Sequence, residues 1–204
     1  TQTHYNPATT GSTWMGNITL LGRHQFLGFE GAPTTGLLNM DLLAPGINSG
    51  FGLSVSYDKY GPISTYNATV NYAYHIGFGK HQTLSLGVGA GIQFCQYDGT
   101  GNIYESPDDP IAYYEQDTQL APDVNIGVQY TLKNWVIGAS ITHLQRYFMP
   151  KDLRFEQVNY HLYTRYRFEV ARYWNIVPSV AVHYDGVTVN EEVNLLFEYT
   201  KAVW

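Results

Sequence analysis

Apolar and polar residues alternate along most of this 204-residue chain. In residues 83–96 one face of an extended strand would be continuous hydrocarbon, formed by Leu84, Leu86, Val88, Ala90, Ile92 and Phe94. The opposite face would be small or polar, formed by Ser85, Gly87, Gly89, Gly91 and Gln93. A period of two is typical of β-strands. The same pattern predicts ten strands, near residues 13–25, 35–43, 51–57, 68–78, 83–96, 123–132, 135–143, 158–170, 175–184 and 192–200.

The polar faces of these segments distinguish two all-β architectures. A sandwich would expose charged residues, whereas most polar faces here consist of Gly, Ser, Asn, Thr and Gln. Charged residues make up 14% of the chain, against roughly 25% in a typical soluble domain. Aromatic residues favour strands in general, but they also mark the interfaces of transmembrane barrels. Near strand ends lie Tyr72, Tyr74, Phe78, Tyr130, Trp135, Tyr166, Phe168, Trp174 and Tyr199. Together these features favour a transmembrane β-barrel.

The connections between predicted strands alternate in length. Long connections are expected at 26–34, 58–66, 97–122, 144–157 and 185–191, and short ones at 44–49, 79–82, 133–134 and 171–174. Outer-membrane barrels have short periplasmic turns and longer external loops. We therefore predict a single domain, residues 1–204, that forms an antiparallel up-and-down barrel with a periplasmic N-terminus. Lys80, Lys133 and Arg172 then lie in periplasmic turns.

Composition excludes several other classes of protein. The longest apolar run, Ile111 to Tyr114, is far shorter than the roughly 18 residues of a membrane-spanning helix. A net charge of −6 argues against nucleic-acid binding. The single cysteine, Cys95, allows no internal disulfide and no Cys-based zinc site. Carboxylates gather in residues 98–123, which contain no Lys or Arg, and we expect a solvated external loop there; calcium binding is the alternative.

Catalytic and metal-binding signals are weak. The chain has none of the common hydrolase, zinc-protease, Walker or Rossmann motifs, so we expect no enzyme and no cofactor. His75, His161 and His183 should point inward, as hydrogen-bonded luminal residues rather than metal ligands. Arg165 and Arg167 would be costly in lipid and should also face inward. They are expected to pair with carboxylates such as Glu169, Glu198 or Asp41; an anion-selective patch is the alternative.

Short motifs along the whole chain resemble the PorP/SprF family of outer-membrane barrels, which serve the type IX secretion and gliding machinery of Bacteroidota. The resemblance rests on Asn6-Pro7-Ala8, Gly11-Ser12, Arg23 to Gly28, Gly31 to Thr35, Asp58 to Pro62, Tyr72 to Ile76, Asn134-Trp135, Gly138 to Ser140, His143-Leu144, Tyr166 to Phe168, Trp174 and Pro178-Ser179. Phe26 and Tyr60 depart from the family pattern but keep apolar bulk. The resemblance implies about four further strands, in a barrel of roughly fourteen.

The resemblance also implies a function and partners. Family members engage the C-terminal domain of a secreted surface protein, such as a gliding adhesin, and anchor it or help export it. Contacts with a periplasmic peptidoglycan-binding lipoprotein and with other translocon components are further expectations. Gly and Pro make two predicted external loops stiff, so the expected partner-binding residues are Phe26, Gly31, Pro33, Lys59, Tyr60 and Pro62. A passive porin or small-solute transporter is the alternative, since small inward residues permit an open lumen.

Overall fold

The computed structural model describes residues 2–12, 16–29, 31–99, 116–149 and 156–199. They form one antiparallel sheet of eleven strands, in which strands that follow one another along the chain are neighbours, except for two short strands that both lie beside the same partner. The strands are β1 (Gly16–His24), β2 (Thr34–Ala44), β3 (Ser49–Tyr60), β4 (Ile63–Gly77), β5 (Gln82–Asp98), β6 (Gln116–Leu132), β7 (Trp135–Thr142), β8 (Asn159–Tyr166), β9 (Phe168–Ala171), β10 (Trp174–Tyr184) and β11 (Val189–Tyr199). The predicted up-and-down order is therefore confirmed for these residues.

The ten predicted strands all occur, with one of them divided. The segment predicted at 158–170 is interrupted at Arg167 and becomes β8 and β9, which both pair with β10. The other elements among the described residues are short helical turns: α1 (Gln2–Tyr5), η1 (Pro7–Thr9), η2 (Pro45–Ile47) and η4 (Leu144–Phe148). No helix in the described ranges is long and apolar enough to cross a membrane.

Several strands extend further than predicted. β3 and β4 continue to a two-residue turn, Gly61-Pro62, so the predicted long connection at 58–66 is wrong. The connection predicted at 185–191 is also short, because β11 begins at Val189. β6 begins at Gln116, which places Asp117 in a strand instead of the predicted acidic loop, and Asp123 lies within the strand as the prediction at 123–132 requires. Beyond the apolar band both faces of a strand meet polar surroundings, so the alternation that reveals a strand in the sequence disappears there.

The two faces of the sheet differ as the alternation predicts. On β5, Leu86, Val88 and Ile92 are exposed on the outer face, while Ser85 and Gln93 are buried on the inner face. Exposed aromatic residues mark both ends of the outer face, with Tyr66, Tyr160 and Tyr184 at one end and Tyr74, Phe78, Trp135, Phe168 and Trp174 at the other. This distribution is typical of a lipid-facing surface between two interfaces.

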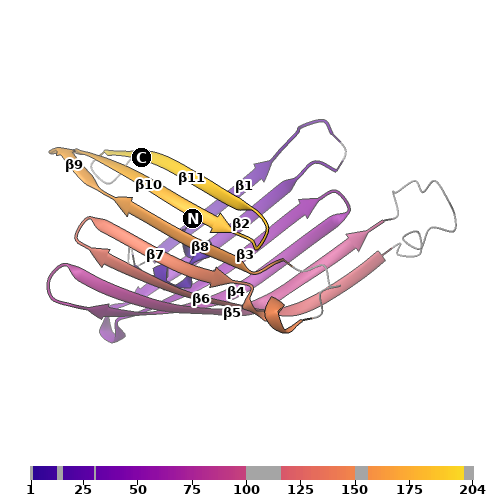
Figure 1. Ribbon diagram of the computed structural model, residues 1–204, viewed down its shortest axis with the longest axis horizontal. Helices are drawn as coiled ribbons and strands as arrows, with labels where there is room; N and C mark the ends of the chain where they lie inside the picture. Colours follow the sequence, from indigo (N-terminus) through magenta and orange to yellow (C-terminus); the bar gives the residue numbers. More distant parts are fainter. Residues whose placement is uncertain (1, 13–15, 30, 100–115, 150–155, 200–204) are drawn as a thin grey trace.

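The sheet is strongly curved, with β1 to β4 lying behind β7 to β11 in Figure 1. Its two edges are β1, which pairs with β2, and β11, which pairs with β10. Closure of a barrel and its fourteen strands therefore stay predictions. The connections β2–β3, β4–β5, β6–β7 and β9–β10 share one end, here named the turn end. The connections β1–β2, β3–β4, β5–β6, β7–β8 and β10–β11 share the opposite end, here named the loop end.

Nitroxide labels on adjacent residues of β11 provide a test of this face assignment. Val193 lies on the outer face and Asn194 on the inner face, where it pairs with Ser179. In a bilayer, a label at 193 is expected to collide with oxygen, which concentrates in lipid. A label at 194 is expected to collide with a water-soluble nickel complex, because the inner face is polar. The same collision profile at both positions would contradict the assignment.

Candidate functional site

The N-terminal residues form a compact segment on the inner side of the sheet (Figure 1). Asn6 caps the short helix η1 by accepting a hydrogen bond from the Ala8 N–H at 2.9 Å. Pro7 fits the first helical position because its missing N–H would be unpaired there. Gly11 follows with a φ of +69°, which turns the chain away from the helix. The sequence from Asn6 to Gly11 thus specifies its own local fold.

Asn6 attaches this segment to the wall of the sheet. Its side-chain amide is fully buried and donates to the carbonyl oxygens of Val128 at 3.0 Å and Ala139 at 3.3 Å, and to the Tyr163 hydroxyl at 3.2 Å. Further along, the Thr10 carbonyl lies 3.0 Å from His75 Nε2, and the Gly11 N–H donates to Asp41 at 3.1 Å. The segment is therefore bound to strands from β2 to β8.

Glycines on the inner face make room for this segment. A Cβ atom on Gly87 would lie 2.1 Å from the Ala8 nitrogen, and one on Gly127 would lie 1.9 Å from Asn6 Oδ1. A Cβ atom on Gly50 would lie 2.0 Å from the Thr10 carbonyl oxygen. The small inward residues therefore leave space that the N-terminal residues of the same chain fill. We call residues 4–12 the luminal plug.

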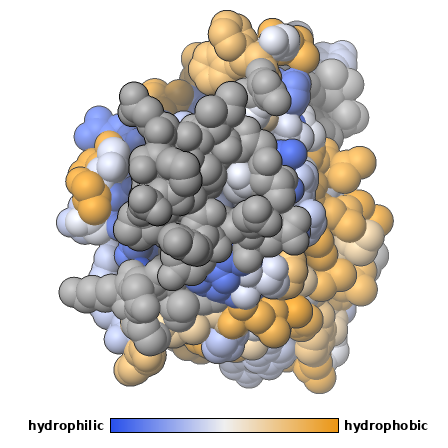
Figure 2. Space-filling view, turned by 90° about the vertical axis from the view of Figure 1, so that its right-hand side faces the viewer, coloured by the Kyte–Doolittle hydropathy of each residue, from blue (hydrophilic) through white to orange (hydrophobic). Residues whose placement is uncertain are grey.

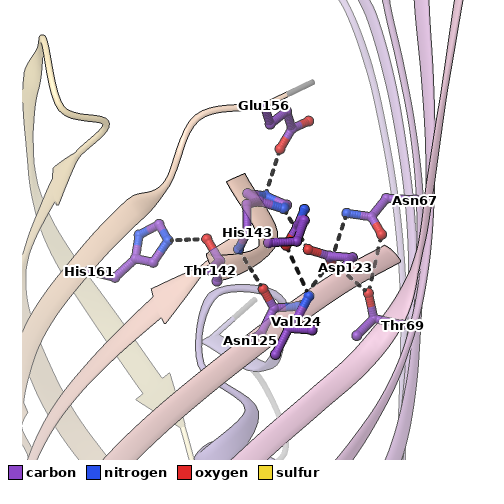
Figure 3. Close-up of polar contacts among 10 residues, drawn as sticks. Asn67, Thr69, Asp123, Val124, Asn125, Thr142, His143, Glu156 and His161 are labelled. Carbon is purple, nitrogen blue, oxygen red and sulfur yellow. Dashed lines mark hydrogen bonds and ion pairs between the residues drawn. The ribbon is translucent and has the colours of Figure 1, made fainter. Parts of the chain in front are cut away.

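A buried polar cluster lies next to the plug, toward the loop end (Figure 3). Asp123 on β6 contacts His143 Nδ1 at 2.8 Å and also accepts hydrogen bonds from Asn67, Thr69 and Asn125. The Nε2 atom of His143 lies 2.7 Å from Glu156. The Asp123 side chain is completely buried. His143 thus joins a carboxylate of the wall to a carboxylate of the connection between β7 and β8.

The two carboxylates determine the charge of His143. Burial by itself would lower its pKa, but hydrogen bonds to Asp123 and Glu156 raise the pKa of His143 to about 10. Burial would likewise raise the pKa of Glu156, whereas the hydrogen bond and the charge of His143 lower it. His143 is therefore protonated at neutral pH and does not serve as a general base. Its chemistry suits an electrostatic clasp between the wall and the connection.

The cluster borders a polar cavity of about 120 Å³ that also contacts Tyr5 and Pro7 of the plug. Within the described ranges, no group of three or more His, Cys, Asp or Glu side chains has a geometry that could hold a metal ion. His161 and His183 do face inward as predicted, with their Nδ1 atoms 2.6 Å apart and the Tyr5 ring beside both. His75 also faces inward and bridges Ser85 to the plug.

Of the two arginines predicted to face inward, Arg167 forms a predicted salt bridge, whereas no ion pair of Arg165 is found among the described residues. The Arg167 guanidinium lies 3.1 Å from Glu198 on β11, one of the three carboxylates predicted as partners. Asp41, another of them, binds the plug through Gly11 and also accepts from Asn17. The acidic loop predicted at 98–123 lies largely outside the described residues, since 100–115 are not described, and its calcium alternative stays a prediction.

The predicted partner-binding residues lie together at the loop end. The Gly61 N–H donates to the Gly31 carbonyl at 3.1 Å, which joins the β1–β2 connection to the β3–β4 turn. Beside this joint, Phe26 is 69% exposed and Tyr60 is 72% exposed. Pro33 accepts from the Gln25 N–H, Pro62 accepts from the Asp98 N–H, and Lys59 pairs with Thr34. Figure 2, which views this end, shows apolar residues along the margin and polar residues nearer the middle.

Sequence reasoning missed several features of the site. Leu27 and Phe29 are also exposed at the loop end and extend the apolar surface around Phe26. Glu156 and the clasp were not predicted, because their partners are distant in sequence. The sequence did contain a signal for the plug. Asn6-Pro7 is typical of the start of a helix and Gly11 of its end, and no strand pattern precedes residue 13.

Comparison with known protein families matches residues 1–204 to the family described as type IX secretion system membrane protein PorP/SprF. Comparison with curated proteins gave no match, and neither did comparison with solved structures. The family is a membrane component of a secretion system and not an enzyme family, and an all-β sheet with an apolar outer face fits the outer membrane. The resemblance of the short motifs is thus confirmed, and the chain belongs to the PorP/SprF family.

Proposed function

We propose that this protein anchors a secreted cell-surface protein, or helps export it, by binding the C-terminal domain of that protein at the loop end. The observation that carries the proposal is the joined pair of connections that presents Phe26 and Tyr60. Exposed aromatic side chains on a rigid base are suited to act as interface anchors. Leu27 and Phe29 enlarge the same surface. The proposed partner is thus an exported domain with a complementary apolar patch, such as that of a gliding adhesin.

The proposed orientation places the loop end outside the cell and the turn end in the periplasm, with the N-terminal strand β1 running outward. Contacts with a peptidoglycan-binding lipoprotein and with other translocon components would then be made at the turn end. The luminal plug weighs against the alternative of a passive porin, because residues 4–12 occupy the inner side of the sheet where solutes would pass.

Co-purification from detergent-solubilised outer membranes tests the general proposal. A surface protein recovered in stoichiometric amounts would support an anchor or export partner. Recovery of the barrel alone, together with solute flux in a liposome-swelling assay, would instead support the porin alternative.

Replacing Phe26 and Tyr60 together by serine tests the proposed contact residues. Each aromatic anchor is expected to contribute about 2 kcal/mol if it is buried at the interface. The double variant should therefore lose surface display of the partner while the barrel keeps its heat-modifiable migration on gels. A control replaces Phe78 and Tyr173, which are also exposed but lie at the turn end. Normal display by the Phe26/Tyr60 variant would mean that these rings only cover the barrel mouth.

A further inference from the structure

Three of the four connections at the turn end carry an exposed cation. Lys80 lies between β4 and β5, Lys133 between β6 and β7, and Arg172 between β9 and β10. These connections are successive along the sheet, because β4 to β8 and β10 follow one another in pairing order. Figure 1 shows them side by side at the left end. We call Lys80, Lys133 and Arg172 the basic arc.

Backbone hydrogen bonds tie the elements of the arc together. The Lys133 N–H donates to the His81 carbonyl at 2.8 Å, and the Arg167 N–H donates to the Asn134 carbonyl at 2.9 Å. Successive turns at one end of an antiparallel sheet are separated by two strand spacings, about 10 Å. The three cations therefore stand in a row at regular spacing along one rim.

These cations are not neutralised by neighbouring carboxylates. None of them belongs to the ion pairs found within the described residues, which involve His143, Arg167 and His183. The Arg172 guanidinium lies over the Tyr173 ring, 5.5 Å from its centre. Among the described residues, the loop end has the opposite balance: Asp58, Asp98, Asp117, Glu156, Asp185, Glu191 and Glu192 outnumber Arg23, Lys59 and Arg146. At the turn end Lys80, Lys133, Arg167 and Arg172 outnumber Glu169 and Glu198, so the described residues of this rim carry a net positive charge.

Aromatic side chains place this rim at the surface of the bilayer. Phe78, Trp135, Tyr173 and Trp174 are exposed and lie within two residues of the cations. Such rings sit at the level of lipid headgroups, where the apolar outer face of a barrel ends. Cations at that level attract anionic headgroups.

We propose that the basic arc binds anionic phospholipid headgroups of the leaflet at the turn end. The continuity of the arc with the lipid-facing surface favours lipid over an acidic protein as the occupant. Each cation would contact one phosphate through charge-assisted hydrogen bonds while the adjacent aromatic ring packs on the acyl chain. The inference does not depend on the function proposed above.

Two tryptophans of the rim provide the probe. The full chain, with Trp14→Phe and Trp204→Phe so that Trp135 and Trp174 alone fluoresce, is reconstituted in mixed phosphatidylcholine and phosphatidylglycerol vesicles. Bromine atoms placed on one lipid at a time quench the tryptophans that this lipid contacts. We expect phosphatidylglycerol to occupy the sites next to these two tryptophans with an apparent affinity about fivefold higher than that of phosphatidylcholine, as measured by quenching. This is the preference that one cation gives at an anionic surface.

A charge variant and a matched control decide the outcome. Lys80→Gln/Lys133→Gln/Arg172→Gln should abolish the preference, whereas Arg23→Gln/Lys59→Gln/Arg146→Gln at the loop end should keep it. About 1 M salt should also remove it, because the Debye length then falls to about 3 Å. Equal quenching of the parent protein by both lipids would overturn the proposal. A preference that survives in the first triple variant would overturn it as well.

Discussion

Replacing Gly87 by valine is expected to drive the luminal plug away from the wall. The new Cβ atom would lie 2.1 Å from the Ala8 nitrogen and 2.4 Å from the Pro7 carbonyl carbon, and neither backbone atom can rotate aside. A displaced plug loses the three hydrogen bonds that Asn6 donates to the wall. At about 1 kcal/mol each, these correspond to a roughly 100-fold rise in the population of the open state.

Cysteine labelling measures this change. Thr10→Cys in a Cys95→Ser background places the only thiol in the plug, at a residue that is fully buried and whose hydroxyl has no hydrogen-bond partner. The rate of reaction with a water-soluble maleimide should rise about 100-fold when Gly87→Val is added. Gly77→Val is the control, since a Cβ atom on Gly77 meets nothing within 4 Å. Continued protection of the introduced thiol in a Gly87→Val barrel that migrates as folded would contradict the plug assignment.

The strands could be predicted because one physical requirement repeats along the chain. Each membrane-facing segment must present apolar residues to one side and small or polar residues to the other. In β5 the alternation of residue types in the sequence matches the alternation of exposed and buried side chains in the structure. The prediction failed where that requirement ends. Ser64 and Thr65 of β4 and Gln116 to Gln119 of β6 extend beyond the apolar band, so their strand conformation leaves no alternation to detect.

The site could be predicted only in part, because its contacts join residues far apart in the chain. Phe26 and Tyr60 were found since turn residues flank them locally. The function of Gly87 and Gly127 could not be predicted, because an inward glycine is equally consistent with an open lumen and with a filled one. Asp123 lies at the boundary between the predicted acidic loop and the predicted strand 123–132, and no local pattern indicated that it contacts His143 twenty residues later.

Replacing His143 by glutamine is expected to cost about 3 kcal/mol or more of unfolding free energy. The substitution leaves the Asp123 carboxylate, whose side chain is completely buried, without its cation, and breaking one side of a buried ion pair typically costs about 3–5 kcal/mol. Urea unfolding in detergent, followed by tryptophan fluorescence, measures the loss. His81→Gln is the control, because His81 is exposed in a turn and contacts neither carboxylate of the clasp.

The pH dependence of that difference tests the charge of the clasp. The pKa of His143 is raised from 6.5 to about 10, so its contribution should be complete below pH 6.5 and lost as the pH rises toward 10. The pKa of Glu156 is lowered from 4.5, so its contribution should be complete above that value and lost as the pH falls below it. The stability gap between the parent and His143→Gln should therefore be widest between pH 4.5 and 6.5 and close by about pH 10. A gap that stays constant from neutral pH to pH 10 would mean that His143 stabilises this region by packing and not by its charge.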